Sequence, residues 1–254
     1  MQIDLNSDLG EGFGPWKMGD DAAMLDIVTT ANIACGFHAG DPETMRNTIG
    51  LARERDVAVG AHPGYRDLIG FGRRPRTWVT STEIENLVAY QVGAFQAMAS
   101  LAGHPAGHVK THGALGNACA DNDDLADAVA RGIRAADPDL AFMVMPGTAT
   151  DRAAERAGLR PIREVYADRT YDDSFNLTSR KTKGAVIHDV DAALVRVMEI
   201  VTEGRLESVT GKRLPVTIDS ICVHGDNAAA VDMARALRHG LERDGWTVAP
   251  VPLH

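Results

Sequence analysis

Residues 3–9 read Ile3-Asp4-Leu5-Asn6-Ser7-Asp8-Leu9, so polar side chains alternate with mostly apolar ones. In a β-strand this period of two puts Asp4, Asn6 and Asp8 on one face. Polar groups turned into a fold carry a large desolvation cost unless they are paired or bind a ligand. The pattern predicts a strand whose apolar face meets helices and whose polar face lines the functional lumen of a barrel.

Outward from this strand, the chain alternates short β-like runs with helical stretches. Further strands are predicted at 30–36, 57–61, 108–111, 141–145, 163–167 and 220–223. Helices are predicted from 42 onward, from 80 to about 101, and at 121–136, 148–157, 190–202 and 227–242. Two start signals are specific: Asp41 as an N-cap before Pro42, and Thr80 with Glu83 as a capping box.

Strand–helix repetition predicts a parallel sheet, because parallel strands need crossover connections. Seven such units in 254 residues suit a single α/β domain over 1–254, a closed or nearly closed TIM-like barrel. An open doubly wound sheet is the alternative. Two segments fit the repeat poorly: 168–189, which is either a lid or a solvated loop, and 204–215, which resembles a small hairpin.

Composition limits the partners and the compartment. The formal net charge is −9 and no basic stripe is visible, which argues against nucleic acid and anionic membranes as partners. The first residues lack the basic and apolar pattern of a signal peptide, and no stretch is apolar enough to cross a bilayer. The 3 cysteines are far apart, so we expect a reducing, cytoplasmic location.

Histidines follow four of the predicted strands: His38, His62, His112 and His224. Parallel barrels and open α/β sheets both place their ligand sites at the carboxyl edge of the strands. A single histidine there is more often structural, but four beside glycine or proline indicate a functional ring.

Residue types alone leave several roles open for this ring. A His–Asp pair can act as a general base on water, and Lys110 can stabilise an oxyanion or hold a phosphoryl group. A divalent metal is also possible, with Asp8, His38 and His62 as a plausible ligand set.

Several runs of the chain resemble the LamB/YcsF family, the A subunit of bacterial 5-oxoprolinase. They are Asp4–Gly14, Ala31–Asp41, Gly60–Gly64, Gly70–Arg74, Glu164–Arg169 and Cys222–Asp226. The resemblance spans essentially the whole chain, and the run around His38 is very specific. It implies a distorted seven-stranded barrel related to the glycoside hydrolase/deacetylase superfamily.

The resemblance also implies ATP-dependent opening of the 5-oxo-L-proline lactam to L-glutamate, with ATP as co-substrate and B and C subunits as partners. Because the chain has no recognisable nucleotide-binding loop, ATP handling is expected to be shared with them. Carried over by motif, the catalytic residues are Asp8, Glu11, His38, His62, Lys110, His112 and His224. Substrate or phosphate binding is assigned to Asn6, Asp41, Asp168, Arg169 and Asp226.

Two other functions remain open at this point. One is an ATP-independent, metal-dependent amidohydrolase or deacetylase. The other is a non-catalytic binding subunit, because the chain has Thr111 and Gly116 where the family pattern has Pro and Tyr.

Overall fold

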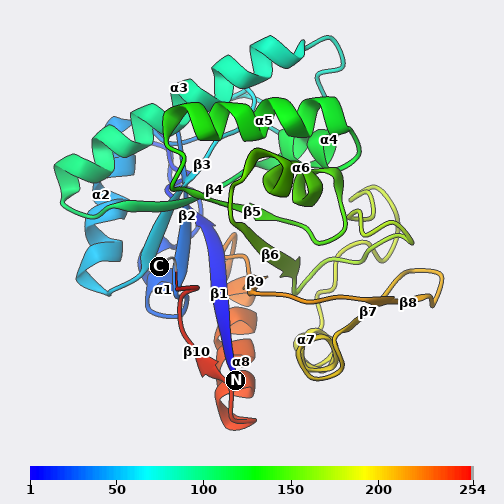
Figure 1. The fold of residues 1–254 in the computed structure, drawn as a ribbon. Coiled ribbons are helices and arrows are strands. Elements are labelled where there is room, and N and C mark those ends of the chain that lie inside the picture. Colours follow the sequence, from blue (N-terminus) through cyan, green and yellow to red (C-terminus); the bar gives the residue numbers. More distant parts are fainter. Residues whose placement is uncertain (253–254) are drawn as a thin grey trace.

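The computed structural model describes residues 1–252, in which seven parallel strands close into a barrel (Figure 1). The strands are β1 (Gln2–Leu9), β2 (Thr30–Ala34), β3 (Ala58–His62), β4 (Ala106–Lys110), β5 (Ala141–Val144), β6 (Pro161–Tyr166) and β9 (Ser220–Cys222). Each pairs with the next, and β9 pairs back onto β1 with Asp4 opposite Ser220. The closed barrel is confirmed and the open-sheet alternative is wrong.

The helices surround the barrel (Figure 1). They are α1 (Asp21–Leu25), α2 (Pro42–Glu54), α3 (Ser81–Ala102), α4 (Gly113–Ala120), α5 (Asp123–Ala136), α6 (Ala149–Ala157), α7 (Val190–Glu203) and α8 (Ala228–Arg243). The sequence pattern did not predict α1, which has only 5 residues, or α4, whose two glycines lower helix propensity. Packing of buried side chains such as Leu115 and Cys119 therefore decides α4.

Both predicted helix starts are confirmed. The Asp41 carboxylate accepts a hydrogen bond from the backbone N–H of Thr44, with Pro42 in the first turn of α2. At α3, the Thr80 hydroxyl accepts from the Glu83 backbone N–H while the Glu83 carboxylate accepts from that of Thr80. These caps satisfy N–H groups that have no partner within the helix.

The alternation along β1 is also confirmed. Ile3, Leu5 and Leu9 belong to the hydrophobic core, whereas Asp4 and Asn6 are buried among polar partners from other strands. The core thus lies between barrel and helices, and the lumen is polar.

The two segments that fit the repeat poorly lie outside the barrel. The antiparallel strands β7 (Arg205–Glu207) and β8 (Arg213–Pro215) form the predicted hairpin beside α7 (Figure 1). Residues 168–189 form turns and isolated bridges, and their movement as a lid stays a prediction. One further strand, β10 (Thr247–Val248), pairs with β1 from outside the closed ring.

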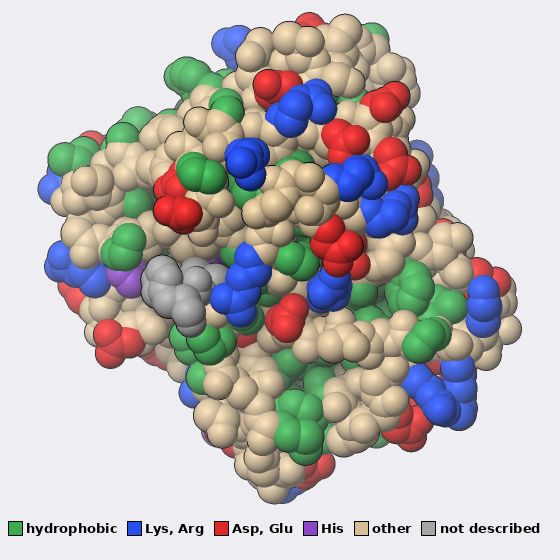
Figure 2. Space-filling model, viewed as in Figure 1, with side chains coloured by type: hydrophobic (Ala, Val, Ile, Leu, Met, Phe, Trp, Pro, Cys, Tyr) green, Lys and Arg blue, Asp and Glu red, His purple; other side chains and the backbone are tan. Residues whose placement is uncertain are grey.

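The outer surface carries interleaved charges, as Figure 2 shows for one face. Between α6 and α5, Arg152 pairs with Asp123 and Arg156 pairs with Asp127. No helix in the described part of the chain is long and apolar enough to span a bilayer.

Asp4 gives the barrel a predicted pH dependence. Burial raises its pKa to about 6 from an ordinary 3.8, against the lowering effect of hydrogen bonds from Ser220, Thr29 and Thr30. The folded chain therefore keeps this proton to higher pH than the unfolded chain. The associated stability is fully present below pH ~4 and is lost as the pH rises through ~6, a change of about 3 kcal/mol.

Replacing Asp4 by Asn should remove this contribution. Denaturant unfolding of both proteins at pH 4 and pH 7 measures it. The wild type should lose about 2 kcal/mol more between the two pH values than Asp4→Asn does. Equal losses in the two proteins would contradict the assignment.

Candidate active site

The floor of the site is a hydrogen-bonded layer of lumen side chains. The Asn6 amide donates to Glu164 (3.1 Å) and Ser220 (2.8 Å), and its oxygen accepts from Asn32 (2.8 Å). His108 donates from Nε2 to the Asn32 side-chain oxygen at 2.7 Å. Burial lowers the pKa of His108 to about 3, so this ring is neutral and supports the layer structurally.

Lys110, at the end of β4, is a cation enclosed by two carboxylates. Its Nζ lies 3.1 Å from Asp8 Oδ1 and 2.9 Å from Glu164 Oε2, and the residue is 1% exposed. Burial alone would lower the pKa of Lys110, but the charge of Asp8, followed by those of Cys222 and Glu164, raises it well above the usual value. Lys110 thus neutralises two of the protein's own acids, and its predicted contact with an oxyanion or phosphate stays a prediction.

Asp8 connects this layer to the histidines. Its second oxygen lies 3.2 Å from His62 Nε2. Burial would raise the pKa of Asp8, but the charges of His62 and Lys110 outweigh it and hold that pKa well below its usual range. Asp8 is therefore an anion at neutral pH.

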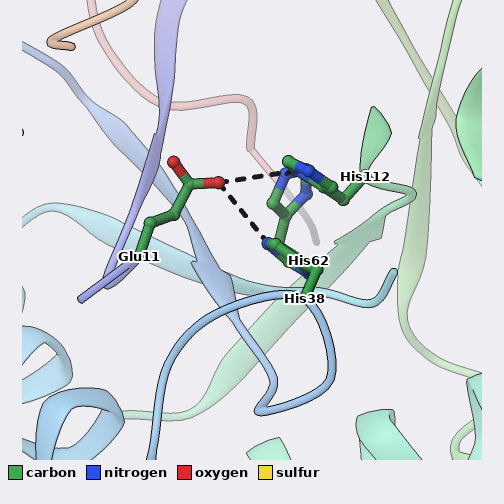
Figure 3. Close-up of side chains that lie close together, drawn as sticks. All are labelled: Glu11, His38, His62 and His112. Atoms are coloured by element: carbon green, nitrogen blue, oxygen red, sulfur yellow. Dashed lines mark hydrogen bonds and ion pairs between the residues drawn. The ribbon is translucent and has the colours of Figure 1, made fainter. Parts of the chain in front are cut away.

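Three histidines and Glu11 form a compact group above Asp8 (Figure 3). The Glu11 carboxylate points at His38 Nε2 (3.4 Å) and His112 Nδ1 (3.5 Å). His38 stacks face to face on His112, with ring centroids 3.7 Å apart, while His62 meets His112 edge-on. Burial lowers the pKa of both His38 and His112 well below the usual value, so both rings are neutral.

The glycine at position 72 makes room for this group. Its φ of +60° suits glycine, and a Cβ there would lie 2.8 Å from atoms of both His38 and His112. The sequence run 70–74 therefore positions rings that come from other loops.

His224, following β9, forms a second unit with Asp168, following β6. Its Nδ1 lies 2.9 Å from Asp168 Oδ2. Burial alone would lower the pKa of His224, but the hydrogen bond to Asp168 and the charges of Asp168 and Asp8 raise it. This is the geometry of a general base whose orientation is set by a carboxylate.

A cavity of about 170 Å³ opens beside these groups. Asp8, Glu11, Gly225 and Asp226 line it together with the exposed Lys17. It is smaller than the ~300–1,000 Å³ usual for drug-sized ligands, so it suits a small metabolite.

Three predicted binding residues make contacts within the protein, and their roles in binding substrate or phosphate stay predictions. Asn6 is fully buried and its amide is used by the lumen layer. Asp41 caps α2 and also accepts from the Gly14 N–H. Arg169 donates to the carbonyls of Ala185 and Thr178, so it organises its own loop.

Other participants were not recognised from the sequence. His108 shares strand parity with Lys110, a signal that could have placed it in the lumen. Tyr166, at the end of β6, lies under Lys110 with its ring centroid 4.9 Å from Nζ, and ring-to-cation contact is favourable there. Lys17 lies in a loop without periodicity, so no pattern could have indicated it.

The family follows from the whole chain. The sequence model of the LamB/YcsF family matches residues 3–253. The chain belongs to the LamB/YcsF family.

Two similar LamB/YcsF-type relatives are named as the A subunit of 5-oxoprolinase. The one from Nitrobacter hamburgensis is 54% identical over 250 residues, covering 98% of both chains. The one from Rhodopseudomonas palustris is 56% identical over 248 residues, covering 98% of this chain and 97% of the other.

Solved structures agree with this LamB/YcsF assignment. The lactam utilization protein from Thermus thermophilus has a TM-score of 0.93 and 39% identity, covering 99% of this chain and 100% of that chain. A peptidoglycan N-acetylglucosamine deacetylase domain from Eubacterium rectale has a TM-score of 0.51 at 12% identity, covering 98% and 88%. The second likeness supports the predicted deacetylase-like fold.

Proposed function

We propose that this chain is the A subunit of an ATP-dependent 5-oxoprolinase, which opens the lactam of 5-oxo-L-proline to L-glutamate. The observation that carries the proposal is the 54% identity, over 98% of both chains, to a protein named as the A subunit of 5-oxoprolinase. The size of the cavity that Asp8, Glu11 and Gly225 line, about 170 Å³, is in keeping with a small cyclic amide as substrate.

The chemistry needs activation, because an unstrained lactam is resonance-stabilised. Transfer of the γ-phosphoryl group of ATP to the lactam oxygen would release ADP and leave a strongly electrophilic carbon. His224, oriented by Asp168, would then take a proton from the attacking water and return it to the ring nitrogen as the C–N bond breaks. Cleavage of the C–N bond leaves a γ-glutamyl phosphate, and a second water hydrolyses this acyl phosphate to glutamate and phosphate, so one ATP and two waters are consumed for each ring opened.

The structure changes which cationic side chain we assign to the phosphoryl group. Lys110 and Arg169 are engaged with protein partners, whereas Lys17 lines the cavity. We therefore assign Lys17, with cations of B and C partner subunits, to the phosphate or the substrate carboxylate. Because the reaction depends on ATP, we expect it to take place in the cytoplasm.

Turnover of 5-oxoproline and ATP, measured with and without B and C subunits, tests the proposal. We expect glutamate and ADP to form together, in equal amounts, only when all three subunits are present. Full ring opening by the isolated chain would overturn the division of labour. Absence of turnover by the complete set of subunits would overturn the function and leave a binding role.

An ATP-independent amidohydrolase is the second candidate, favoured by the cluster of Glu11 with three histidines. The turnover assay distinguishes this candidate from the ATP-dependent one. An ATP-independent amidohydrolase would form glutamate at an undiminished rate when ATP is omitted and Zn²⁺ is supplied.

A further inference from the structure

Two ring nitrogens face each other at the centre of the histidine cluster. His62 Nδ1 lies 2.8 Å from the Lys110 carbonyl, and His112 Nε2 lies 2.9 Å from the Phe71 carbonyl. Because a carbonyl oxygen only accepts, each of these nitrogens carries its ring's proton. Without a second proton on either ring, the remaining nitrogens, His62 Nε2 and His112 Nδ1, both carry lone pairs, and they lie 3.0 Å apart. Asp8 Oδ2 lies 3.2 Å from the same His62 nitrogen, so negative charge also converges there.

Lone pairs at this distance repel unless a positive species lies between them. Two more donors converge on the same point, Glu11 Oε1 and His38 Nε2 (Figure 3). Among residues 1–252, neither Glu11 Oε1 nor either ring nitrogen of His38 has a hydrogen-bond partner, although all are buried. Buried polar atoms are normally satisfied, so a group of this kind indicates a ligand.

We propose that Glu11, His38, His62 and His112 form a binding site for one divalent transition-metal ion. Tetrahedral ligands at 2.0–2.1 Å from zinc lie about 3.4 Å apart. The separations here are 3.0 Å for His62–His112, 3.4 Å for Glu11–His38 and 3.5 Å for Glu11–His112. Imidazoles with one carboxylate suit zinc, cobalt or iron rather than magnesium or calcium.

The surroundings match those of a metal site. The backbone carbonyls that hold the N–H groups of His62 and His112 fix ring orientation and tautomer, as outer partners of metal-bound histidines do. The His38 ring lies parallel to that of His112, with centroids 3.7 Å apart, so one of the two rings must turn for both to bind the same ion. Gly64 leaves space on the other side of the His38 ring, because a Cβ there would lie 2.6 Å from Nδ1.

This ligand set differs from the one predicted from the sequence, which combined Asp8 with His38 and His62. Asp8 is already held by Lys110 at 3.1 Å and by the Asn32 amide at 2.9 Å. Glu11 replaces it because its carboxylate lacks such partners and faces two of the rings. An ion bound there would also border the cavity, which Glu11 lines.

Metal content and direct binding test the proposal without any assay of activity, so its outcome is separate from that of the proposed function. The full chain is stripped with a chelator and titrated with Zn²⁺ by calorimetry and with Co²⁺ by visible absorption. We expect one ion per chain, a tetrahedral-type Co²⁺ spectrum and a metal-dependent rise in the unfolding temperature. The stripped chain failing to bind either ion would overturn the proposal and assign a proton to the point between His62 Nε2 and His112 Nδ1.

Variants locate the ion. His112→Ala should abolish binding, and the isosteric Glu11→Gln, which removes only a charge, should weaken it by more than about tenfold. The exposed His239→Ala on α8 should bind as the wild type does, and Asp8→Asn should weaken binding less than Glu11→Gln does, with folding checked by circular dichroism. Loss of the ion in Asp8→Asn together with full binding in Glu11→Gln would overturn this ligand assignment.

Discussion

Replacing Lys110 by Met is expected to lower the free energy of unfolding at pH 7 by about 3–5 kcal/mol. The change leaves the carboxylates of Asp8 and Glu164 buried without their shared cation, 3.1 Å and 2.9 Å from its present position. Uncompensated buried charge costs far more than the loss of a surface ion pair. Urea or guanidinium unfolding measures the effect.

Two comparisons make this result specific. Lys183→Met, an exposed lysine in the 168–189 segment, should change stability by less than about 0.5 kcal/mol. Adding Asp8→Asn to Lys110→Met should recover part of the loss, because one of the two unpaired anions is removed. A Lys110→Met protein as stable as the wild type would show that the lumen carboxylates do not depend on this cation.

Replacing His224 by Gln is expected to lower turnover of the reconstituted complex by roughly 10²–10⁴-fold, the usual contribution of a general base. Asp168→Asn keeps the imidazole but removes the hydrogen-bonded carboxylate that raises the pKa of His224. In that variant the rise of activity with pH should move to lower pH while the maximum rate falls. The pH dependence of kcat and the imidazole NMR titration report the same shift.

His239→Gln provides the matched control, since His239 is exposed on α8 and its side chain is 72% accessible. It should leave turnover unchanged. If His224→Gln retained full activity, or if Asp168→Asn left the pH profile in place, the His224–Asp168 pair would be only structural.

Strand-level predictions from the sequence were confirmed because they depend on local periodicity. The alternation at Asp4, Asn6 and Asp8 located the lumen, and the glycine- and proline-flanked histidines located the carboxyl edge. The metal ligands and catalytic roles assigned there stay predictions. Helix α4 was missed because burial, rather than propensity, forms it.

Side-chain partnerships could not be predicted, because they depend on register between strands far apart in the chain. Asn6 reaches Ser220 and Glu164 only because β9 pairs with both β1 and β6. Likewise, arginine is a residue type that often binds phosphate, yet the Arg169 guanidinium donates hydrogen bonds to two backbone carbonyls of its own loop. The local sequence pattern indicated the edge of the sheet at which the functional side chains gather. The pairing register between distant strands decides which of these side chains contact one another.

The pairing of β1 with β9 also bears on how the chain is made. Asp4 and Ser220 are 216 residues apart, and the ring has no complete hydrogen-bonded circuit until both are available. During synthesis β1 emerges well before β9, so β1 obtains its second neighbouring strand late, and Asp4 and Asn6 lack their β9 partner Ser220 until then. The barrel therefore cannot close before β9 has been made, and nascent chains that stop before Ser220 should remain open to proteolysis along β1.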